Sequence, residues 1–231
     1  MPKQASTGSQ LLDAFLQGGY ETDTITTLYG PAGCGKTTLA LLAAIACARS
    51  GKKAIYLDTE GGFSVERLKQ LTAEHKKVQQ SIIFLKPTRF EEQTKAIEKL
   101  NQVITPSIGL IIIDSLSMLY RLERSTETEQ SKTFTQQLGA QLRTLSEITR
   151  RKNVSILLTS QVYSSFDQPH QHNPVRLVGG ELVKYASKCI LEIQSMHGSR
   201  RKLILRKHRS IGGEKEVLFD IVQTGIHEVT V

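Results

Sequence analysis

The stretch LYGPAGCGKTT, which runs from Leu28 to Thr38, decides the fold of this chain. It contains the pattern G-x-x-x-x-G-K-T, in which glycines allow backbone N–H groups to close around phosphate groups. An apolar run precedes the stretch and a helix-like run follows it, as the pattern requires. We therefore predict a phosphate-binding loop made of Gly30, Pro31, Ala32, Gly33, Cys34, Gly35, Lys36, Thr37 and Thr38.

Two further features fit a bound nucleoside triphosphate. Lys36 is expected to reach the β- and γ-phosphates, and the hydroxyl of Thr37 is expected to bind Mg²⁺. Residues 110–114 read LIIID, a buried strand that ends in Asp114, where Mg²⁺ or its water shell needs an acceptor. This second motif is weak alone and becomes strong with the loop upstream.

The order of the elements predicts an α/β fold. Short apolar runs alternate with segments of helical period through the first two-thirds of the chain. The expected strands are residues 25–29, 54–58, 82–85, 110–114 and 154–159, and the expected helices lie near residues 36–49, 64–74, 90–103 and 131–151. Four of these five strands are continuously apolar, as in a parallel sheet that helices cover on both faces.

The pattern changes after Gln161. A helix is expected near residues 181–186, followed by short strands at 189–193, 203–206, 217–221 and 226–230 with turn signals between them. No linker or internal repeat divides the chain. We therefore predict one domain over residues 1–231, built as a doubly wound, mostly parallel sheet with an antiparallel extension at its C-terminal edge.

The composition narrows the class of protein. The 231 residues carry a formal net charge of +8, which favours a polyanionic partner such as nucleic acid, although a basic chain can also simply be soluble. Three widely spaced cysteines make no disulfide framework and indicate a reducing compartment. The most apolar run, residues 39–48, covers about half a membrane span, and the N-terminus lacks a signal-peptide core. We expect a soluble cytoplasmic protein with no membrane partner.

Two more strand ends carry polar groups suited to catalysis. Residues 58–62, DTEGG, follow the second strand, and a carboxylate there can orient or deprotonate a water that attacks the γ-phosphate. The alternative is that Asp58 and Glu60 cap the helix that begins near Ser64. Gln161 follows the fifth strand, where a neutral amide can sense the γ-phosphate and relay its presence into the next loop.

These motifs and several others together resemble a known family. The others are STGS at residues 6–9, LQGG at 16–19, YLDTEG at 56–61, LYR at 119–121 and SQV at 160–162. In this order they are similar to the ATPase core of the RecA/RadA recombinases. The resemblance implies a RecA-like P-loop NTPase that uses ATP and Mg²⁺, binds DNA and serves homologous recombination. By matching position it implies catalytic roles for Lys36, for Glu60 as the base and for Gln161 as the γ-phosphate sensor, with Thr37 and Asp114 at the metal.

The sequence also departs from the strand-exchange members of that family. Only five residues precede Ser6, so we expect no N-terminal helix-hairpin-helix domain and no linker phenylalanine to dock on a neighbouring subunit. Residues 207–213, KHRSIGG, stand where the family has a proline-rich strip that caps ATP between subunits. With these departures the chain resembles a core-only paralogue of the family, and that resemblance implies a mediator or regulator of recombination and DNA repair with weak ATPase activity and no strand exchange of its own.

The basic stretch RRKLILRKHR at residues 200–209 holds six Lys or Arg and no acid. In one interpretation Arg200, Arg201 and Lys202 contact the DNA backbone. In a second, Lys207 and Arg209 reach across a subunit boundary as an arginine finger, as in hexameric helicase and clock-protein relatives. In a third, the charges only protect an exposed strand edge from aggregation.

By the same resemblance, two loops are expected to contact DNA. They are residues 123–132 and residues 163–180. The first eight residues of the first loop contain three acids and only one Arg. The second loop carries aromatic and basic side chains suited to single-stranded bases, namely Phe166, His170, His172 and Arg176. The expected partners are single-stranded or branched DNA, other recombination proteins such as the main recombinase or a junction nuclease, and copies of the chain itself. The protein would then be associated with the nucleoid.

Two alternative functions stay open. Lys207 and Arg209 support a ring-forming, DNA-stimulated ATPase or helicase-like motor. A signalling ATPase related to the clock proteins would carry two adjacent catalytic acids where this chain has Thr59 and Glu60. All of these share one fold, so the strand pattern does not separate them.

Overall fold

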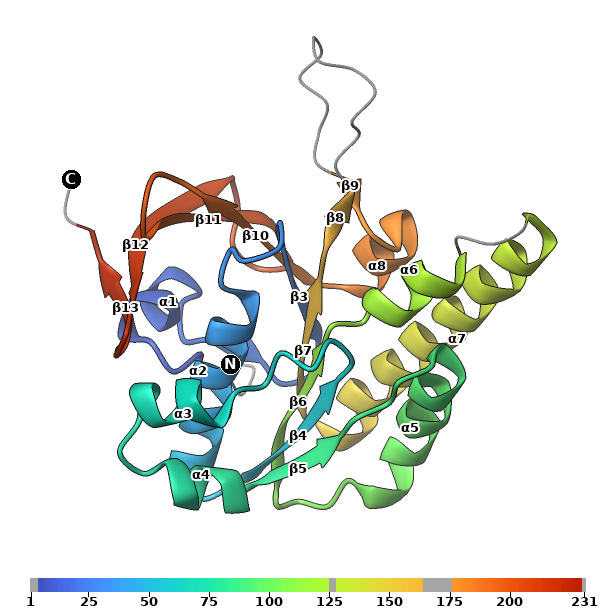
Figure 1. Cartoon of the computed structure of the whole chain (residues 1–231), viewed down its shortest axis with the longest axis horizontal. Coiled ribbons are helices and arrows are strands. Elements are labelled where there is room, and N and C mark those ends of the chain that lie inside the picture. The colour runs from blue at the N-terminus through green and yellow to red at the C-terminus, as the bar shows by residue number, and fades with distance from the viewer. Residues whose placement is uncertain (1–3, 125–127, 164–175, 230–231) are drawn as a thin grey trace, which may run out of the picture.

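The computed structural model describes residues 4–124, 128–163 and 176–229. Helices α1–α4 and the C-terminal strands lie on one side of the molecule, and α5–α8 lie on the other (Figure 1). The helices are α1 (Gln10–Phe15), α2 (Lys36–Arg49), α3 (Val65–Leu71), α4 (His75–Gln80), α5 (Phe90–Val103), α6 (Met118–Arg124), α7 (Thr128–Lys152) and α8 (Gly180–Ala186). Within the described ranges, no helix is both long and apolar enough to cross a membrane.

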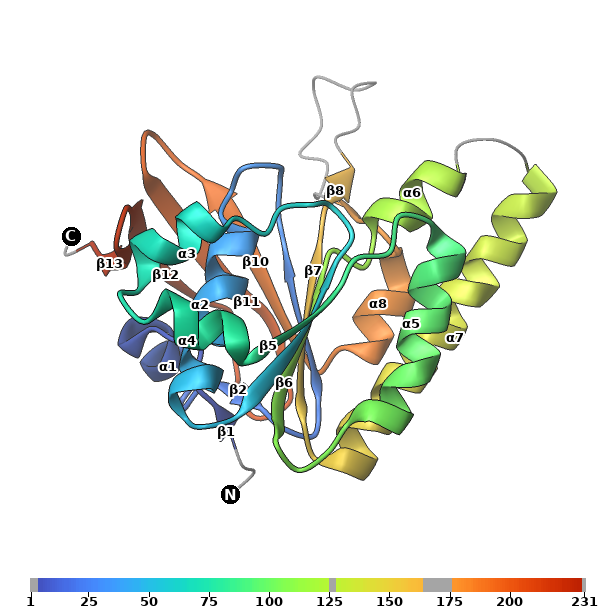
Figure 2. The same cartoon turned by 60° about the horizontal axis from the view of Figure 1, so that its bottom comes forward.

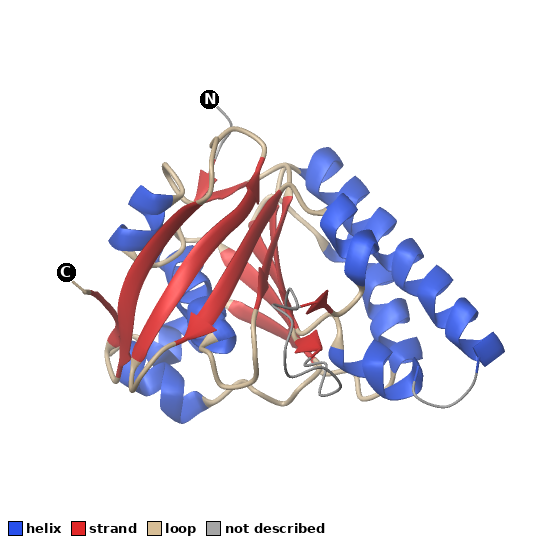
Figure 3. Ribbon diagram, turned by 90° about the horizontal axis from the view of Figure 1, so that it is seen from above, coloured by secondary structure: helices blue, strands red, loops and turns tan. Residues whose placement is uncertain are grey.

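The strands are β1 (Gln4–Ala5), β2 (Tyr20–Glu21), β3 (Ile25–Tyr29), β4 (Lys53–Asp58), β5 (Ile82–Leu85), β6 (Ile108–Asp114), β7 (Ser155–Ser160), β8 (Val162–Tyr163), β9 (Arg176–Leu177), β10 (Cys189–Ser195), β11 (Arg200–His208), β12 (Lys215–Val222) and β13 (Gly225–Glu228). Nine of them form one sheet in the order β13-β12-β11-β10-β3-β7-β6-β4-β5. The strands from β10 to β5 pair in parallel, and β11, β12 and β13 continue the sheet in antiparallel pairs. This confirms the predicted doubly wound core with its antiparallel extension, which lies on the opposite flank from the long helices (Figure 3).

Each central strand sends alternate side chains into two separate cores. In β6, Leu110 and Ile112 pack with residues of α2, whereas Ile111 and Ile113 pack with residues of α5 and α7. Figure 2 shows α1–α4 over the first face and α5–α8 over the second. Because helices cover both faces, the central strands have to be continuously apolar, which is the pattern that predicted them.

Most element boundaries follow the sequence-based prediction. Helices α2 and α5 begin and end at the predicted residues, and the five core strands lie within two residues of their predicted positions. The helix expected at residues 64–74 is interrupted. Helix α3 ends at Leu71 because Thr72 takes an extended conformation, with φ −157° and ψ 136°, and α4 begins at His75.

The described residues of the loop expected at 123–132 are helical, so the prediction of a loop there was wrong, whereas contact of this segment with DNA stays a prediction. Helix α6 extends through Arg124, and α7 already begins at Thr128. The reason is apolar spacing, since Leu119 and Tyr120 are buried and the Tyr120 ring lies 5.8 Å from that of Phe90 in α5. In the other expected loop, Phe166, His170 and His172 lie outside the described residues, and the backbone of Arg176 belongs to β9.

A buried carboxylate marks the change from parallel to antiparallel pairing. Glu192 of β10 is 4% exposed, and its Oε2 accepts hydrogen bonds from the Tyr29 hydroxyl at 2.8 Å and from Arg206 Nε at 2.7 Å. Its Oε1 accepts a hydrogen bond from Gln194 at 2.7 Å. Burial acts to raise the pKa of Glu192, but these donors and the Arg206 charge outweigh it, so the pKa lies below its ordinary value.

We expect Arg206→Met to lower the free energy of unfolding by about 1–3 kcal/mol at neutral pH, because it leaves the buried Glu192 charge without its cation. A carboxyl group with a lowered folded pKa stabilises the protein above its unfolded pKa of about 4.5, and that stabilisation is lost as the pH falls through the folded value. The difference between wild type and variant should therefore shrink in acid. Urea unfolding at several pH values measures it.

The matched control is Lys202→Met, which breaks the surface ion pair with Glu216. We expect a change below about 1 kcal/mol for this variant, because exposed pairs contribute little. An equal loss for both variants, or a loss for Arg206→Met that does not change with pH, would contradict the role assigned to Glu192.

Candidate functional site

The candidate site lies along the carboxyl ends of four adjacent strands, in the order β3-β7-β6-β4. The phosphate-binding loop follows β3, Gln161 follows β7, Asp114 ends β6, and Glu60 comes shortly after β4. Parallel strands bring their carboxyl ends to one edge, where open α/β sheets bind ligands. Residues that are up to 131 positions apart in sequence are thereby gathered at one place.

The shape of the phosphate-binding loop depends on its glycines. A Cβ atom at Gly30 would lie 2.4 Å from the carbonyl oxygen of Ile193 and 2.8 Å from Cys34 Sγ, so a larger residue does not fit. Gly35 has a φ of 108° and caps the start of α2. Burial raises the pKa of the Cys34 thiol, and Cys34 is fully buried beneath the loop. The thiol therefore fills space inside the loop.

The side chain of Lys36 is held inside the phosphate-binding loop by backbone carbonyls. It donates hydrogen bonds to the carbonyl oxygens of Gly30 at 3.0 Å and Pro31 at 2.8 Å. The residue is 7% exposed, so the ammonium group lies within the loop and not in solvent. A phosphate oxygen is a stronger acceptor than a carbonyl because its hydrogen bond with an ammonium group joins opposite charges.

Asp114 connects the loop to the centre of the sheet. Its Oδ2 accepts hydrogen bonds from the Thr37 and Tyr56 hydroxyls, both at 2.8 Å, and its Oδ1 accepts one from Thr159 at 2.5 Å. Burial, followed by the charge of Asp114, raises the pKa of Tyr56 well above its ordinary value, so Tyr56 remains a donor. All three donors reach a carboxylate that is 1% exposed.

Thr37 and Asp114 fit a magnesium ion that is shared with a nucleotide. Mg²⁺ prefers hard oxygen ligands and is commonly held by one or two protein groups together with phosphates and water. The Thr37 hydroxyl and the Asp114 carboxylate are such groups and lie in hydrogen-bond contact. Among the described residues no cluster of three or more His, Cys, Asp or Glu offers a metal site built from protein alone.

Glu60 and Gln161 form a second polar group beside the loop. Glu60 Oε1 accepts hydrogen bonds from Ser115 Oγ at 2.5 Å and from Gln161 Nε2 at 3.0 Å. The other side of the amide, Gln161 Oε1, accepts a hydrogen bond from Arg121 of α6 at 3.0 Å. The side-chain amide of Gln161 therefore connects the Glu60 carboxylate to helix α6.

Asp58 and Glu60 do not cap helix α3, which was the alternative role for these two acids. Ser64 itself caps α3 by accepting a hydrogen bond from the Arg67 N–H at 3.2 Å. Asp58 accepts hydrogen bonds from the backbone N–H groups of Gly62 and Phe63 at 3.1 and 3.2 Å, which folds the turn back on itself. The turn therefore directs Glu60 toward Ser115 and Gln161.

Sequence reasoning missed four residues that hold this site together. They are Tyr56 and Thr159, which donate to Asp114, Ser115, which donates to Glu60, and Arg121, which donates to Gln161. Each lies within or next to a motif that the sequence did reveal. Their partners, however, lie on other strands, and strand order cannot be read from one motif.

The basic stretch at residues 200–209 is largely bound within the chain. Five of its six cations contact acids or carbonyls on other elements. Lys202 contacts Glu216, Arg206 contacts Glu192 and Glu214, Lys207 contacts the carbonyl of Lys184, and Arg209 contacts Glu21 and Asp23. Arg201 donates to the carbonyl of Cys34 in the phosphate-binding loop. Arg200 is exposed. The stretch therefore offers a ligand far less free charge than its composition suggests.

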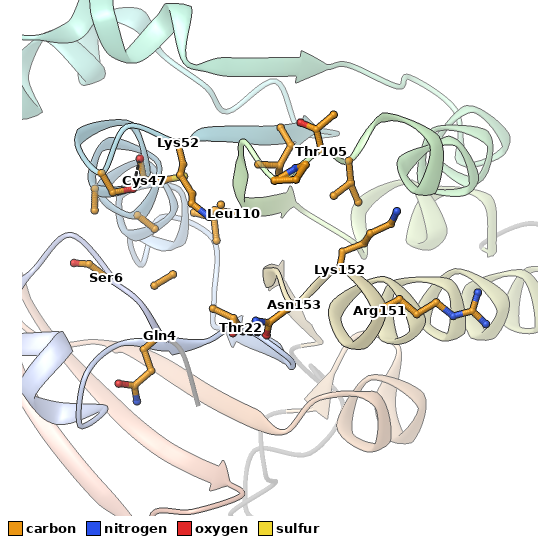
Figure 4. Close-up of a pocket in the computed structure, with 18 residues that line it drawn as sticks. Gln4, Ser6, Thr22, Cys47, Lys52, Thr105, Leu110, Arg151, Lys152 and Asn153 are labelled. Carbon is orange, nitrogen blue, oxygen red and sulfur yellow. Dashed lines mark hydrogen bonds between the residues drawn. The ribbon is translucent and has the colours of Figure 1, made fainter. Parts of the chain in front are cut away.

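A separate cavity of about 580 Å³ lies at the opposite edge of the sheet (Figure 4). Its lining includes Thr22, Lys52 and Asn153, which precede the parallel strands, and residues from the ends of α2 and α7. Lys52, Arg151 and Lys152 stand at or just beyond the carboxyl ends of these helices, where positive charge offsets the free carbonyl groups. This explains the basic lining without a ligand.

Comparison with known proteins gives one family. A sequence model described as Rad51 matches residues 3–229. The DNA repair and recombination protein RadB of Methanococcus maripaludis strain C7 is 38% identical over 94% of this chain and 97% of that protein. RadB of Methanocaldococcus jannaschii is also 38% identical, over 94% of this chain and 98% of that protein. A crystal structure of the RadB recombinase matches with a TM-score of 0.81 at 31% identity and covers 98% of this chain and 100% of that one. The resemblance to the RecA/RadA recombinases is confirmed.

We expect Lys36→Ala to weaken binding of ATP by more than about tenfold, because the variant loses the charged donor at the phosphates. The fold should remain, since Lys36 does not belong to either apolar core and its substitution removes no core contact. Titration with a fluorescent ATP analogue measures the affinity, and circular dichroism checks the fold. Lys52→Ala, just beyond the other end of the same helix, serves as the control and should bind ATP normally. Retained affinity in Lys36→Ala would refute the role of the loop.

Proposed function

This chain belongs to the Rad51 family, and we propose that it is an ATP-binding and DNA-binding recombinase paralogue. In this proposal it acts in homologous recombination and DNA repair as a mediator or regulator. It hydrolyses ATP weakly and carries out no strand exchange of its own. The proposal includes a cytoplasmic, nucleoid-associated location and partners that are single-stranded or branched DNA, other recombination proteins and copies of the chain itself.

The observation that carries the proposal is the gathering of Lys36, Thr37, Asp114, Glu60 and Gln161 at one edge of the sheet. Lys36 and the backbone N–H groups of the loop would hold the phosphates, and Thr37 and Asp114 would hold Mg²⁺. When bound, Mg²⁺ supplies positive charge that offsets the charge of the phosphate oxygens. Glu60 would orient or deprotonate the attacking water, and Gln161 would detect the γ-phosphate.

The hydrogen bonds of Glu60 support slow turnover. One of its two oxygens already accepts from both Ser115 and Gln161, at 2.5 and 3.0 Å. An attacking water that donates a hydrogen bond to this oxygen has to displace Ser115 or Gln161. A water that donates to the other oxygen meets a carboxylate whose orientation these two donors already set. The first arrangement adds a rearrangement before the chemical step, and the second leaves one carboxylate oxygen to orient the water.

The contacts of Gln161 support a regulatory use of ATP. Gln161 touches Glu60 on one side and Arg121 of α6 on the other, and β8 begins at the next residue. The two segments expected to contact DNA begin at the end of α6 and within β8. A change at Gln161 when the γ-phosphate arrives would therefore reach both segments through direct contacts.

The ring-motor alternative has less support from the same geometry. A finger that acts on a neighbouring subunit has to extend from the surface. Lys207 instead donates to the carbonyl of Lys184 at 2.7 Å, and Arg209 forms ion pairs with Glu21 at 2.8 Å and Asp23 at 2.7 Å. Glu21 is 3% exposed, so releasing Arg209 would leave a buried carboxylate without its cation.

The experiment that tests the proposal measures ATP turnover with and without single-stranded DNA, and DNA binding in the same buffer. We expect slow turnover that changes less than about twofold when DNA is bound, because the site uses ATP as a conformational signal. Glu60→Gln should abolish the turnover and keep ATP binding, since the amide cannot accept a proton. Stimulation by DNA of more than about tenfold would favour the motor, and the absence of DNA binding would contradict the proposal.

A further inference from the structure

The C-terminal extension of the sheet is in direct contact with the phosphate-binding loop. Arg201 of β11 donates a hydrogen bond from Nε to the carbonyl oxygen of Cys34 at 3.0 Å. Its Nη1 donates to the carbonyl oxygens of Gly198 at 3.0 Å and Arg200 at 2.8 Å. The guanidinium group is thus fixed to the turn between β10 and β11 through Nη1 and presents its Nε–H to the loop.

A second contact lies one residue further along the loop. A Cβ atom placed on Gly35 would come within 2.2 Å of Ile221 Cδ1, so this residue of β12 lies directly against the loop backbone. The turn after β12 is also held from the other side, because Arg67 of α3 donates to the carbonyl oxygens of Val222 and Gln223, both at 2.9 Å. The extension therefore covers the outer side of the loop and is held in place by α3.

The chemistry of the Cys34–Gly35 peptide gives the Arg201 contact its meaning. The carbonyl of Cys34 and the N–H of Gly35 belong to one peptide group, and the loop binds phosphates through such N–H groups. A cation on the carbonyl oxygen polarises the peptide and makes its N–H a stronger donor, in the way that chains of hydrogen bonds reinforce one another. Arg201 also supplies the Cys34 carbonyl oxygen with a donor, since no backbone N–H of the described residues donates to it.

We propose that Arg201 is a positioning residue of the nucleotide site, through which the C-terminal extension sets the affinity for nucleotide. This inference rests on the proposed function, because it assumes that the loop binds ATP. It also assigns Arg201 a role other than contact with DNA. A partner that shifts the turn between β10 and β11 would lower the affinity for nucleotide without touching the nucleotide itself.

The two neighbours of Arg201 provide matched controls. Successive side chains of a strand point to opposite faces, so Arg200 and Lys202 lie on the face away from the loop. Arg200 is exposed and pairs across the ladder with Asp220, and Lys202 binds Glu216 at 3.0 Å. Three adjacent basic residues of equal charge thus differ in whether they touch the loop.

The test measures the dissociation constant for methylanthraniloyl-ADP, a fluorescent nucleotide, in wild type, Arg201→Ala, Arg201→Lys, Arg200→Ala and Lys202→Ala. We expect Arg201→Ala to weaken binding about tenfold, as for loss of a hydrogen bond from a charged donor. Arg201→Lys should recover part of the loss, since an ammonium group keeps the charge but lacks the planar fork with which Nε and Nη1 reach the loop and the turn together. Arg200→Ala and Lys202→Ala should bind as wild type does.

A second readout separates positioning from general destabilisation. Amide hydrogen exchange, followed by mass spectrometry well below the melting temperature, should rise in Arg201→Ala over residues 30–38 and stay unchanged over the central strands β4 and β6. Arg201→Gln, which keeps a neutral N–H donor, tests the charge if the alanine variant does not fold, and it should lose affinity with the fold retained.

The outcomes that overturn the inference differ from those that overturn the proposed function. Wild type that binds no nucleotide would refute the proposed function. Wild-type binding with equal affinity in Arg201→Ala or Arg201→Gln would refute the role of Arg201 alone. Equal losses of nucleotide affinity in Arg200→Ala and Lys202→Ala would show that the effect depends on net charge and not on the contact of Arg201 with the loop. If Arg201→Ala lost DNA binding and kept nucleotide binding, Arg201 would be a DNA contact instead.

Discussion

The buried carboxylate of Asp114 is the group on which the rest of the site depends. It is 1% exposed, and a charge so deeply buried is tolerated only where donors satisfy it. Its three donors come from different elements: Thr37 from the start of α2, Tyr56 from β4 and Thr159 from β7. Because β4 and β7 flank β6 in the sheet, this one carboxylate connects the phosphate-binding loop to the strand order. A different order of strands would leave Asp114 without its donors.

The sequence was sufficient for the fold because the signals of the fold are local. A continuous apolar run predicts a strand covered on both faces, and the glycine pattern of residues 30–35 involves only near neighbours. The contacts that the sequence did not reveal join distant residues, such as Tyr56 with Asp114, Arg121 with Gln161 and Arg201 with Cys34. Which side chains meet across a sheet depends on strand order and register, and an apolar pattern does not specify partners at that level. Helix α6 is a different case, because the buried residues Leu119 and Tyr120 that favour it are adjacent in the sequence and need no distant partner to be recognised.

The charge of the chain shows the same limit of sequence reasoning. A net charge of +8 and six cations in residues 200–209 suggest a surface for a polyanion. In the fold, acids from β10, β12 and the turns beside them neutralise much of this stretch, as the pairs of Arg206 with Glu192 and Lys202 with Glu216 show. Only the field that remains after such pairing acts on a distant partner. Composition counts charges, whereas binding depends on the charges that the fold leaves unpaired.

Two elements contact the phosphate-binding loop: β7, through the hydrogen bond from the Gly30 N–H to the Ser160 carbonyl oxygen at 3.3 Å, and the C-terminal extension, through Arg201. On one side, Gln161 contacts Glu60 and Arg121, so a ligand that attracts the amide of Gln161 disturbs its hydrogen bonds with both. On the other side, Arg201 and Ile221 connect the loop to the C-terminal extension. Hydrolysis and signalling place opposite demands on Glu60, because the hydrogen bonds that couple it to Gln161 also restrict its access to water. The proposed regulatory role would use this coupling, because a γ-phosphate that attracts the Gln161 amide would also change the hydrogen bonds of Glu60.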